Sequence, residues 1–125
     1  MQWIFLIGNE EFNISSLEKI EYYGSSSAYY VKEIGGRYCV EFGDEHIFYD
    51  MVNDIKDFEE DISSVPYTEP TIIMLSYTSS KLVKKILAQD NFPKDIYIDN
   101  DSGLIAPLND FIQLKMPRNY MIVKI

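Results

Sequence analysis

Thr71-Ile72-Ile73-Met74-Leu75-Ser76-Tyr77 is the stretch that decides the fold, and a helical pattern follows it directly. An apolar run without alternation is typical of a strand that is covered on both faces. The residues Thr78-Ser79-Ser80 can cap a helix over residues 81–89. The apolar stripe of that helix consists of Leu82, Val83, Ile86 and Leu87. We therefore expect a central strand packed against the helix that follows it.

The N-terminal side of this unit reads as short strands. Residues 3–7 predict a buried strand, and Ser15 or Ser16 can cap one helical turn before Ile20. Tyr22 and Tyr23 predict a further short strand.

A hairpin follows, with strands over residues 29–34 and 37–42 around Gly35-Gly36. Paired glycines supply the positive φ angles that a tight hairpin turn requires. Residues 46–50 add a partner strand after the turn at Gly43-Asp44-Glu45, so we expect a three-stranded antiparallel meander.

Residues 52–62 nearly follow a helical period and predict an amphipathic helix with a carboxylate face. Toward the C-terminus, the pattern predicts strands at 95–99 and 103–106, a helical turn through 109–114 and a last strand at 120–125. Strands come first and a strand, helix, strand unit follows. The prediction is one α+β domain over residues 1–125, with a mixed, mainly antiparallel sheet and about two helices in a single layer on one face.

The size and composition fit one globular core. The chain has 125 residues, 46% of them hydrophobic and 14% aromatic. The opening run lacks the basic flank and the cleavage site of a signal peptide, and no stretch approaches the roughly 18 apolar residues that cross a bilayer. Cys39 is the single cysteine, so no internal disulfide can form. We expect a reduced, cytoplasmic setting and no membrane association.

Negative charge is concentrated in the first half of the chain. Residues 1–66 hold fourteen acidic and four basic residues (−10), and residues 67–125 hold six acidic and seven basic ones (+1), which together give the net charge of −9. Nine acids lie between Glu41 and Asp61. Nucleic acids and anionic membranes call for Lys and Arg clusters instead, so a basic protein or a cation is the expected partner.

Two constellations could carry chemistry. Cys39 and His46 are the only possible thiol and imidazole pair, but their expected separation along the hairpin, roughly 13 Å at 3.3 Å per residue, is too large for a working pair. The loop from Asp99 to Gly103 alternates oxygen ligands, yet its glycine is fifth where a calcium loop needs it sixth. We therefore predict no metal, no cofactor and no catalytic set.

The acidic segment is either a solubilising surface or a partner-binding face. A concentrated negative potential speeds association with a basic partner, and tyrosines ringed by polar groups anchor interfaces. The predicted partner face consists of Asp44, Glu45, Tyr49, Asp50, Asp54, Asp57, Glu60, Asp61 and Tyr67.

In these acids, in the aromatic residues between them and in its lack of catalytic motifs, the chain resembles the small acidic immunity proteins that bacteria carry beside polymorphic toxins. The resemblance rests on Glu41 to Asp61 and covers about a third of the chain. It implies that the protein binds and blocks one cognate toxin inside the cell, and it assigns no residue by position. Two alternatives stay open: an enzyme that works with carboxylates, and a scaffold or regulatory module.

Overall fold

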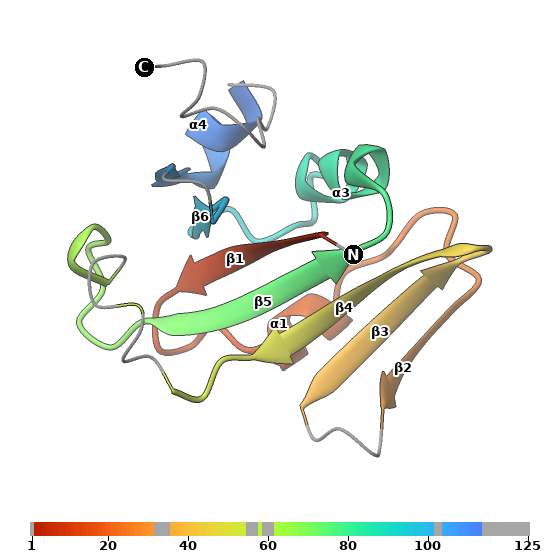
Figure 1. The fold of residues 1–125 in the computed structure, drawn as a ribbon, viewed down its shortest axis with the longest axis horizontal. Coiled ribbons are helices and arrows are strands. Elements are labelled where there is room, and N and C mark those ends of the chain that lie inside the picture. Colours follow the sequence, from red (N-terminus) through yellow and green to blue (C-terminus); the bar gives the residue numbers. More distant parts are fainter. Residues whose placement is uncertain (1, 32–35, 55–57, 59–61, 102–103, 114–125) are drawn as a thin grey trace.

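The structure is a computed structural model that describes residues 2–31, 36–54, 58, 62–101 and 104–113. Seven strands form one sheet in the order β2-β3-β4-β5-β1-β6-β7, accompanied by three short helices, and the α+β prediction is confirmed (Figure 1). In chain order the elements are β1 (Gln2–Gly8), α1 (Ile14–Glu18), β2 (Ser27–Val31), β3 (Arg37–Phe42), β4 (Glu45–Met51), β5 (Thr71–Tyr77), α3 (Ser80–Leu87), β6 (Tyr97–Asp99), β7 (Ile105–Pro107) and α4 (Leu108–Gln113).

Strand β5 is the central strand, as the sequence predicts. It occupies the fourth of seven positions in the sheet, between β4 and β1. Ile73 and Leu75 belong to the apolar cluster on one face, whereas Ile72 and Met74 pack with the cluster on the other face. The unbroken apolar run therefore reflects burial on both faces.

All described strand pairings are antiparallel, so they lack the parallel contact that we expected of a mixed sheet. The predicted strand, helix, strand unit exists as β5-α3-β6. Both of its strands pair antiparallel with β1 and thus run parallel to each other. Strand β1 lies between them and takes up the hydrogen bonds that a parallel pair would have made.

Helices α1, α3 and α4 lie on one face of the sheet. Leu17 of α1, Leu87 of α3 and Phe111 of α4 all belong to one buried cluster with the sheet residues Leu6 and Leu75. In Figure 1, α3 and α4 lie on the side of β1 and β6, and the β2-β3-β4 meander extends away from them. On the opposite face, a second cluster covers only the part of the sheet around β1 and β5; its buried members are Phe5, Ile7, Val65 and Ile72.

Helix α1 begins earlier than predicted. Asn13, not Ser15 or Ser16, is its N-cap, and the Asn13 side chain accepts a hydrogen bond from the Ser16 N–H. The Ser16 hydroxyl in turn accepts from the Asn13 N–H at 3.3 Å, which closes a reciprocal capping box. Asn is at least as good an N-cap as Ser, so the earlier start is favoured.

The β2-β3 hairpin is present, but its register differs from the prediction. Val31 lies opposite Arg37, whereas a two-residue turn at Gly35-Gly36 would place Ile34 there. The observed register stacks Tyr30 on Tyr38 with ring centroids 5.2 Å apart, a cross-strand contact that stabilises antiparallel pairs. Tyr22 and Tyr23, predicted as a strand, lie in the connection before β2.

The predicted helix over residues 52–62 falls mainly outside the described residues. Val52 to Asp54 are not helical, because the Val52 N–H donates to the Ile72 carbonyl at 3.0 Å and keeps the chain beside β5. The predicted strand over residues 120–125 also lies outside the described residues.

The other C-terminal predictions are confirmed. Ser79 caps α3 by accepting from the Leu82 N–H at 3.2 Å, and two short strands and α4 follow. Within the described ranges, each helix is too short and too polar to cross a bilayer.

Candidate binding surface

The face of the meander opposite α1, α3 and α4, which we call the helix-free face, carries a row of side chains that continues over β5 and β1 and so spans five strands. Residues directly opposite each other in an antiparallel sheet point to the same face. Tyr29 lies opposite Cys39, Cys39 opposite Phe48, Phe48 opposite Ser76, and Ser76 opposite Trp3. We call Tyr29, Phe48 and Trp3, on β2, β4 and β1, the aromatic row.

The row alternates large rings with small side chains. Tyr29 and Trp3 are each 44% exposed and Phe48 is half-buried, whereas Cys39 and Ser76 between them are buried. Exposed apolar groups that gather on one face among polar neighbours commonly mark an interaction site, whereas a single exposed ring such as Tyr23 does not. This surface is therefore the strongest candidate for a binding site among the described residues.

Phe48, in the middle of the row, already holds a cation from its own chain. The Arg37 guanidinium lies over the ring with its central carbon 4.8 Å from the centroid. It also donates from Nε to Asp50 Oδ1 at 2.7 Å and from a terminal nitrogen to Oδ2 at 3.1 Å. Hydrogen bonding to Asp50 raises the pKa of Arg37 further above its ordinary value. Arg37 thus stacks on Phe48 and forms a bidentate ion pair with Asp50 on this face.

Tyr29, at one end of the row, is paired with Glu41. Its phenol donates to Glu41 Oε1 at 3.2 Å, and the Ser27 hydroxyl donates to Oε2 of the same carboxylate at 2.7 Å. Contact with Cys39 and with Glu41 raises the pKa of Tyr29 to about 12. The phenol therefore stays neutral and keeps its proton for the carboxylate at neutral pH.

Trp3, at the other end, is paired with Asp101. Its indole Nε1–H donates to Asp101 Oδ2 at 2.9 Å. Asp101 itself is held at a backbone φ of 57° by a turn in which its N–H donates to Asp99 Oδ1 at 2.8 Å. Asp readily adopts this left-handed conformation in such turns. A ring beside a carboxylate is thus repeated at both ends of the aromatic row.

Cys39 and His46 lie closer together than expected. His46 is opposite Glu41, two residues from Cys39, so the pair are diagonal neighbours about 7–8 Å apart in a sheet of this kind. The expected separation was too large because the turn lies at Gly43-Asp44, with Phe42 opposite Glu45, one residue earlier than we expected. Cys39 is buried, however, and burial raises the pKa of its thiol. A reactive thiol requires the opposite shift.

Tyr49, predicted as an interface anchor, is a core residue, and that prediction is wrong. It is fully buried, and its hydroxyl is hydrogen-bonded to that of Tyr22 at 3.0 Å. Burial raises its pKa well above the ordinary value for tyrosine. Along β4, Tyr49 alternates with Phe48 and therefore points to the helix-covered face.

Asp50 and Tyr67 have structural partners. Asp50 forms the ion pair with Arg37 described above. Tyr67 is half-buried, its phenol donates to the Asp95 carbonyl at 2.7 Å, and its ring meets Tyr97 edge-on at 5.9 Å. Tyr67 therefore packs against the covered part of the sheet and lies away from the aromatic row.

The other described members of the predicted partner face do not form one patch. Asp44 and Glu45 are exposed at the β3-β4 turn, and Asp54 is exposed beyond the far end of β4. The six residue steps of that strand separate them by about 20 Å. The remaining predicted members, Asp57, Glu60 and Asp61, lie outside the described residues.

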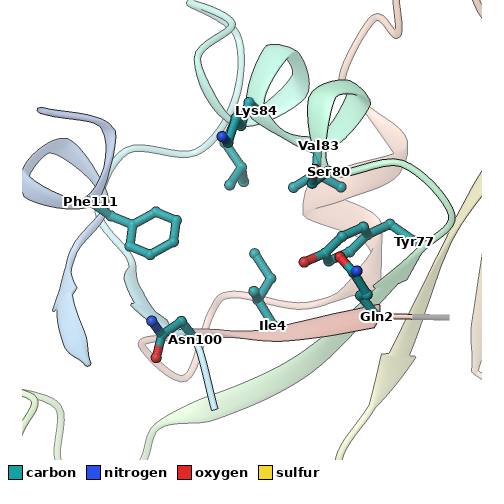
Figure 2. A pocket seen from close by; sticks show the side chains of 9 residues that line it. Gln2, Ile4, Tyr77, Ser80, Val83, Lys84, Asn100 and Phe111 are labelled. Carbon is teal, nitrogen blue, oxygen red and sulfur yellow. The ribbon is translucent and has the colours of Figure 1, made fainter. Parts of the chain in front are cut away.

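The concave sites of the structure are weaker candidates for a functional site than the aromatic row. A cavity of about 130 Å³ lies between β1, β5, α3 and α4, where Phe111 and Tyr77 face each other across it (Figure 2), and its lining contains no carboxylate. A wide depression of about 460 Å³ includes Glu10 and Glu69, both exposed to water. Carboxylates in active sites are usually tuned by burial, which this depression does not provide.

Sequence reasoning missed the aromatic row. Glu41 was counted only as one of the nine acids of the acidic segment. No site was assigned to Trp3, Tyr29, Phe48 or Asp101. Strand alternation could have separated Phe48 from Tyr49, because His46, Phe48 and Asp50 share one face. The alignment of Trp3 with Tyr29, in contrast, depends on four successive strand registers.

Searches against family models, curated proteins and solved structures find no match for this chain.

Proposed function

We propose that this chain is an intracellular protein-binding domain that takes a basic partner on the helix-free face of its meander. The observation that carries the proposal is the aromatic row, which lies outside the cluster around Phe5 and Ile72 and leaves Tyr29 and Trp3 each 44% exposed. Exposed Trp and Tyr rings surrounded by polar groups are the residue types that dominate binding energy at protein interfaces.

The charges around the row favour a basic partner. Glu41 and Asp101 flank its ends, and the exposed Asp44 and Glu45 lie on the turn at one end of the meander. Arg37 is the one described cation among the β2, β3 and β4 residues apart from the titratable His46, and it is already paired. Such a field raises the association rate with a cation-rich surface.

An immunity protein is one protein class that needs these properties. It binds one toxin tightly and quickly, and a basic toxin would be steered by this surface. Cytoplasmic location and bacterial origin belong to the same proposal. The immunity proposal is supported by the helix-free face of the meander. It no longer rests on the whole acidic segment from Glu41 to Asp61.

The test begins with the partner. The chain is immobilised, proteins are captured from the native lysate at low salt, and the captured protein is identified and purified. Its association and dissociation rates are then measured between about 0.05 and 0.5 M salt by surface plasmon resonance. We expect the on-rate to fall with salt, because the Debye length shrinks from about 10 Å at 0.1 M to about 3 Å at 1 M. The off-rate should change less.

A charge reversal with a matched control locates the surface. Asp44→Lys with Glu45→Lys should lower the on-rate about tenfold at low salt. Glu10→Lys with Glu11→Lys makes the same change of charge at another exposed adjacent pair, beyond the opposite end of the strands, and should have a much smaller effect. Equal effects of the two double variants, or an on-rate independent of salt, would contradict the proposal.

A further inference from the structure

Along the aromatic row, a ring and a carboxylate occur together three times: the ring donates to the carboxylate in the two end units, and Arg37 links the two groups in the middle unit. The units are Tyr29 with Glu41, Phe48 with Asp50, and Trp3 with Asp101. They lie on β2, β4 and β1, every second strand of the five that the row crosses.

The middle unit shows what such a unit holds. The Arg37 guanidinium stacks on Phe48 and forms two hydrogen bonds to the Asp50 carboxylate. A planar cation matches this arrangement because its flat face meets the ring while its edge donates to both carboxylate oxygens. The chain has thus filled one unit with its own arginine.

The two end units contain no cation among the described residues. Glu41 accepts hydrogen bonds from Ser27 and Tyr29, and Asp101 accepts one from Trp3. A carboxylate offers about four acceptor positions, so both groups retain positions for further donors. Both rings are 44% exposed and leave room for stacking.

We propose that the two end units bind two arginine side chains of a single extended segment of the partner, which follows the aromatic row from β2 across β3, β4 and β5 to β1. The inference rests on the proposed function and specifies its recognition chemistry. Four strand spacings separate β2 from β1 in the sheet, a distance of about 19 Å. An extended segment covers that distance in about six residues at 3.3 Å per residue.

A second copy of this chain is a poor occupant of the row. It would bring the Glu41 and Asp101 carboxylates of one copy toward those of the other, and like charges at an interface are unfavourable. Its Arg37 would have to leave Asp50 to compensate. Lysine fits the end units less well, because an ammonium group can neither stack as a plane nor bind a carboxylate with two parallel hydrogen bonds.

Trp3 is the only tryptophan in the chain, so its fluorescence reports directly on one end unit. The probes are synthetic peptides of Ser and Thr that carry two arginines six positions apart, two arginines three positions apart, or two lysines six positions apart. We expect the first peptide to change the Trp3 emission and to bind about tenfold more tightly than either of the others.

Conservative variants test the carboxylates. Glu41→Gln and Asp101→Asn should each weaken the first peptide about fivefold, since each leaves the neighbouring ring in place. Asn also tolerates the left-handed backbone of position 101. Glu10→Gln removes an exposed carboxylate outside the row and should have no effect.

Tyr29 and Tyr30 provide a matched pair for the ring. They are adjacent on β2 and 44% and 43% exposed, but they point to opposite faces. Tyr29→Ala should weaken the first peptide about fivefold, whereas Tyr30→Ala should not. Circular dichroism of both variants checks that the fold is retained. The carboxylate variants test the aromatic row independently, because they leave every ring in place.

The arginine proposal is overturned if the three peptides bind equally, or if sedimentation shows that the chain dimerises and that Trp3→Ala abolishes the dimer. Equal peptide binding together with a partner on-rate that the Asp44 and Glu45 reversal lowers would remove the arginine proposal alone. If the reversal also leaves partner binding unchanged, the proposed function fails with it.

Discussion

The sheet has two regions that differ in how they are covered. Most of β5 and β1 is buried on both faces, between the helices and the cluster around Phe5 and Ile72, but this cover does not reach Trp3, which is 44% exposed at one end of β1. The β2-β3-β4 meander is buried only on the helix side, where Tyr49 lies, and its other face carries Phe48. Burial on both faces concentrates folding energy in β5 and β1, and the single cover of the meander leaves rings and carboxylates available for recognition.

The largest predicted effect compares one residue from each region. Leu75→Ala in β5 should cost about 2–5 kcal/mol in the free energy of unfolding, because Leu75 is fully buried and its neighbours cannot fill the cavity. Phe48→Ala in β4 should cost only about 1–2 kcal/mol, because the ring is half-buried and loses mainly its contacts with Arg37 and with the His46 ring. Urea denaturation measures both. A larger loss for Phe48 would mean that the meander face is a structural core and would remove the contrast.

The doubly covered region was predictable and the meander face was not, for a physical reason. The unbroken apolar run of β5 and the 3.6-residue apolar stripe of α3 are local patterns. Each one predicts its strand or helix from residues that are adjacent in the sequence. The aromatic row joins residues as far apart as Trp3 and Phe48, and its alignment depends on the strand order and on four registers.

The hairpin error and the Tyr49 error have the same origin. Gly35-Gly36 favours a tight turn locally, but the register is set by cross-strand contacts such as Tyr30 on Tyr38. Tyr49 was assigned by residue type, although Ile47 and Tyr49 alternate with His46 and Phe48 along β4. Strand alternation outweighs residue type in deciding which tyrosine can reach a partner.

The next prediction concerns the buried hydroxyl pair under the meander. The Tyr22 hydroxyl donates its one proton to the Leu17 carbonyl at 2.8 Å and accepts a hydrogen bond from the Tyr49 hydroxyl at 3.0 Å. Tyr49→Phe should cost about 1 kcal/mol at pH 7, since Tyr22 keeps its carbonyl partner. Thermal and urea denaturation check this value. A cost above about 3 kcal/mol would indicate that the hydroxyl pair stabilises the meander as strongly as apolar burial stabilises β5.

The same pair makes stability depend on alkaline pH. Burial raises the pKa of both phenols above the ordinary value of 10.0, so the folded chain keeps protons that the unfolded chain loses. The stability that the pair contributes is therefore fully present below pH 10 and falls as pH rises above it, by about 1.4 kcal/mol per pH unit and phenol. The urea midpoint between pH 8 and pH 11.5 measures the fall. In Tyr49→Phe the slope should be smaller by one phenol, and an unchanged slope would mean that other groups cause it.

The smallest expected effect is at the turn where the aromatic row meets β6. Calcium or magnesium at millimolar concentration should leave the melting temperature and the Trp3 emission unchanged. One side-chain oxygen of each of three residues of this turn accepts a hydrogen bond: Asp99 Oδ1 from the Asp101 N–H, Asn100 Oδ1 from the Leu104 N–H at 3.1 Å, and Asp101 Oδ2 from Trp3. Calcium needs six to eight oxygen ligands, and the described residues contain no group of three or more metal-ligating side chains that could hold it. Scanning fluorimetry with and without a chelator is the measurement. A rise of several degrees that disappears in Asp101→Asn would show that the turn is a cation site, and the Trp3 end of the row would then recognise a metal in place of an arginine.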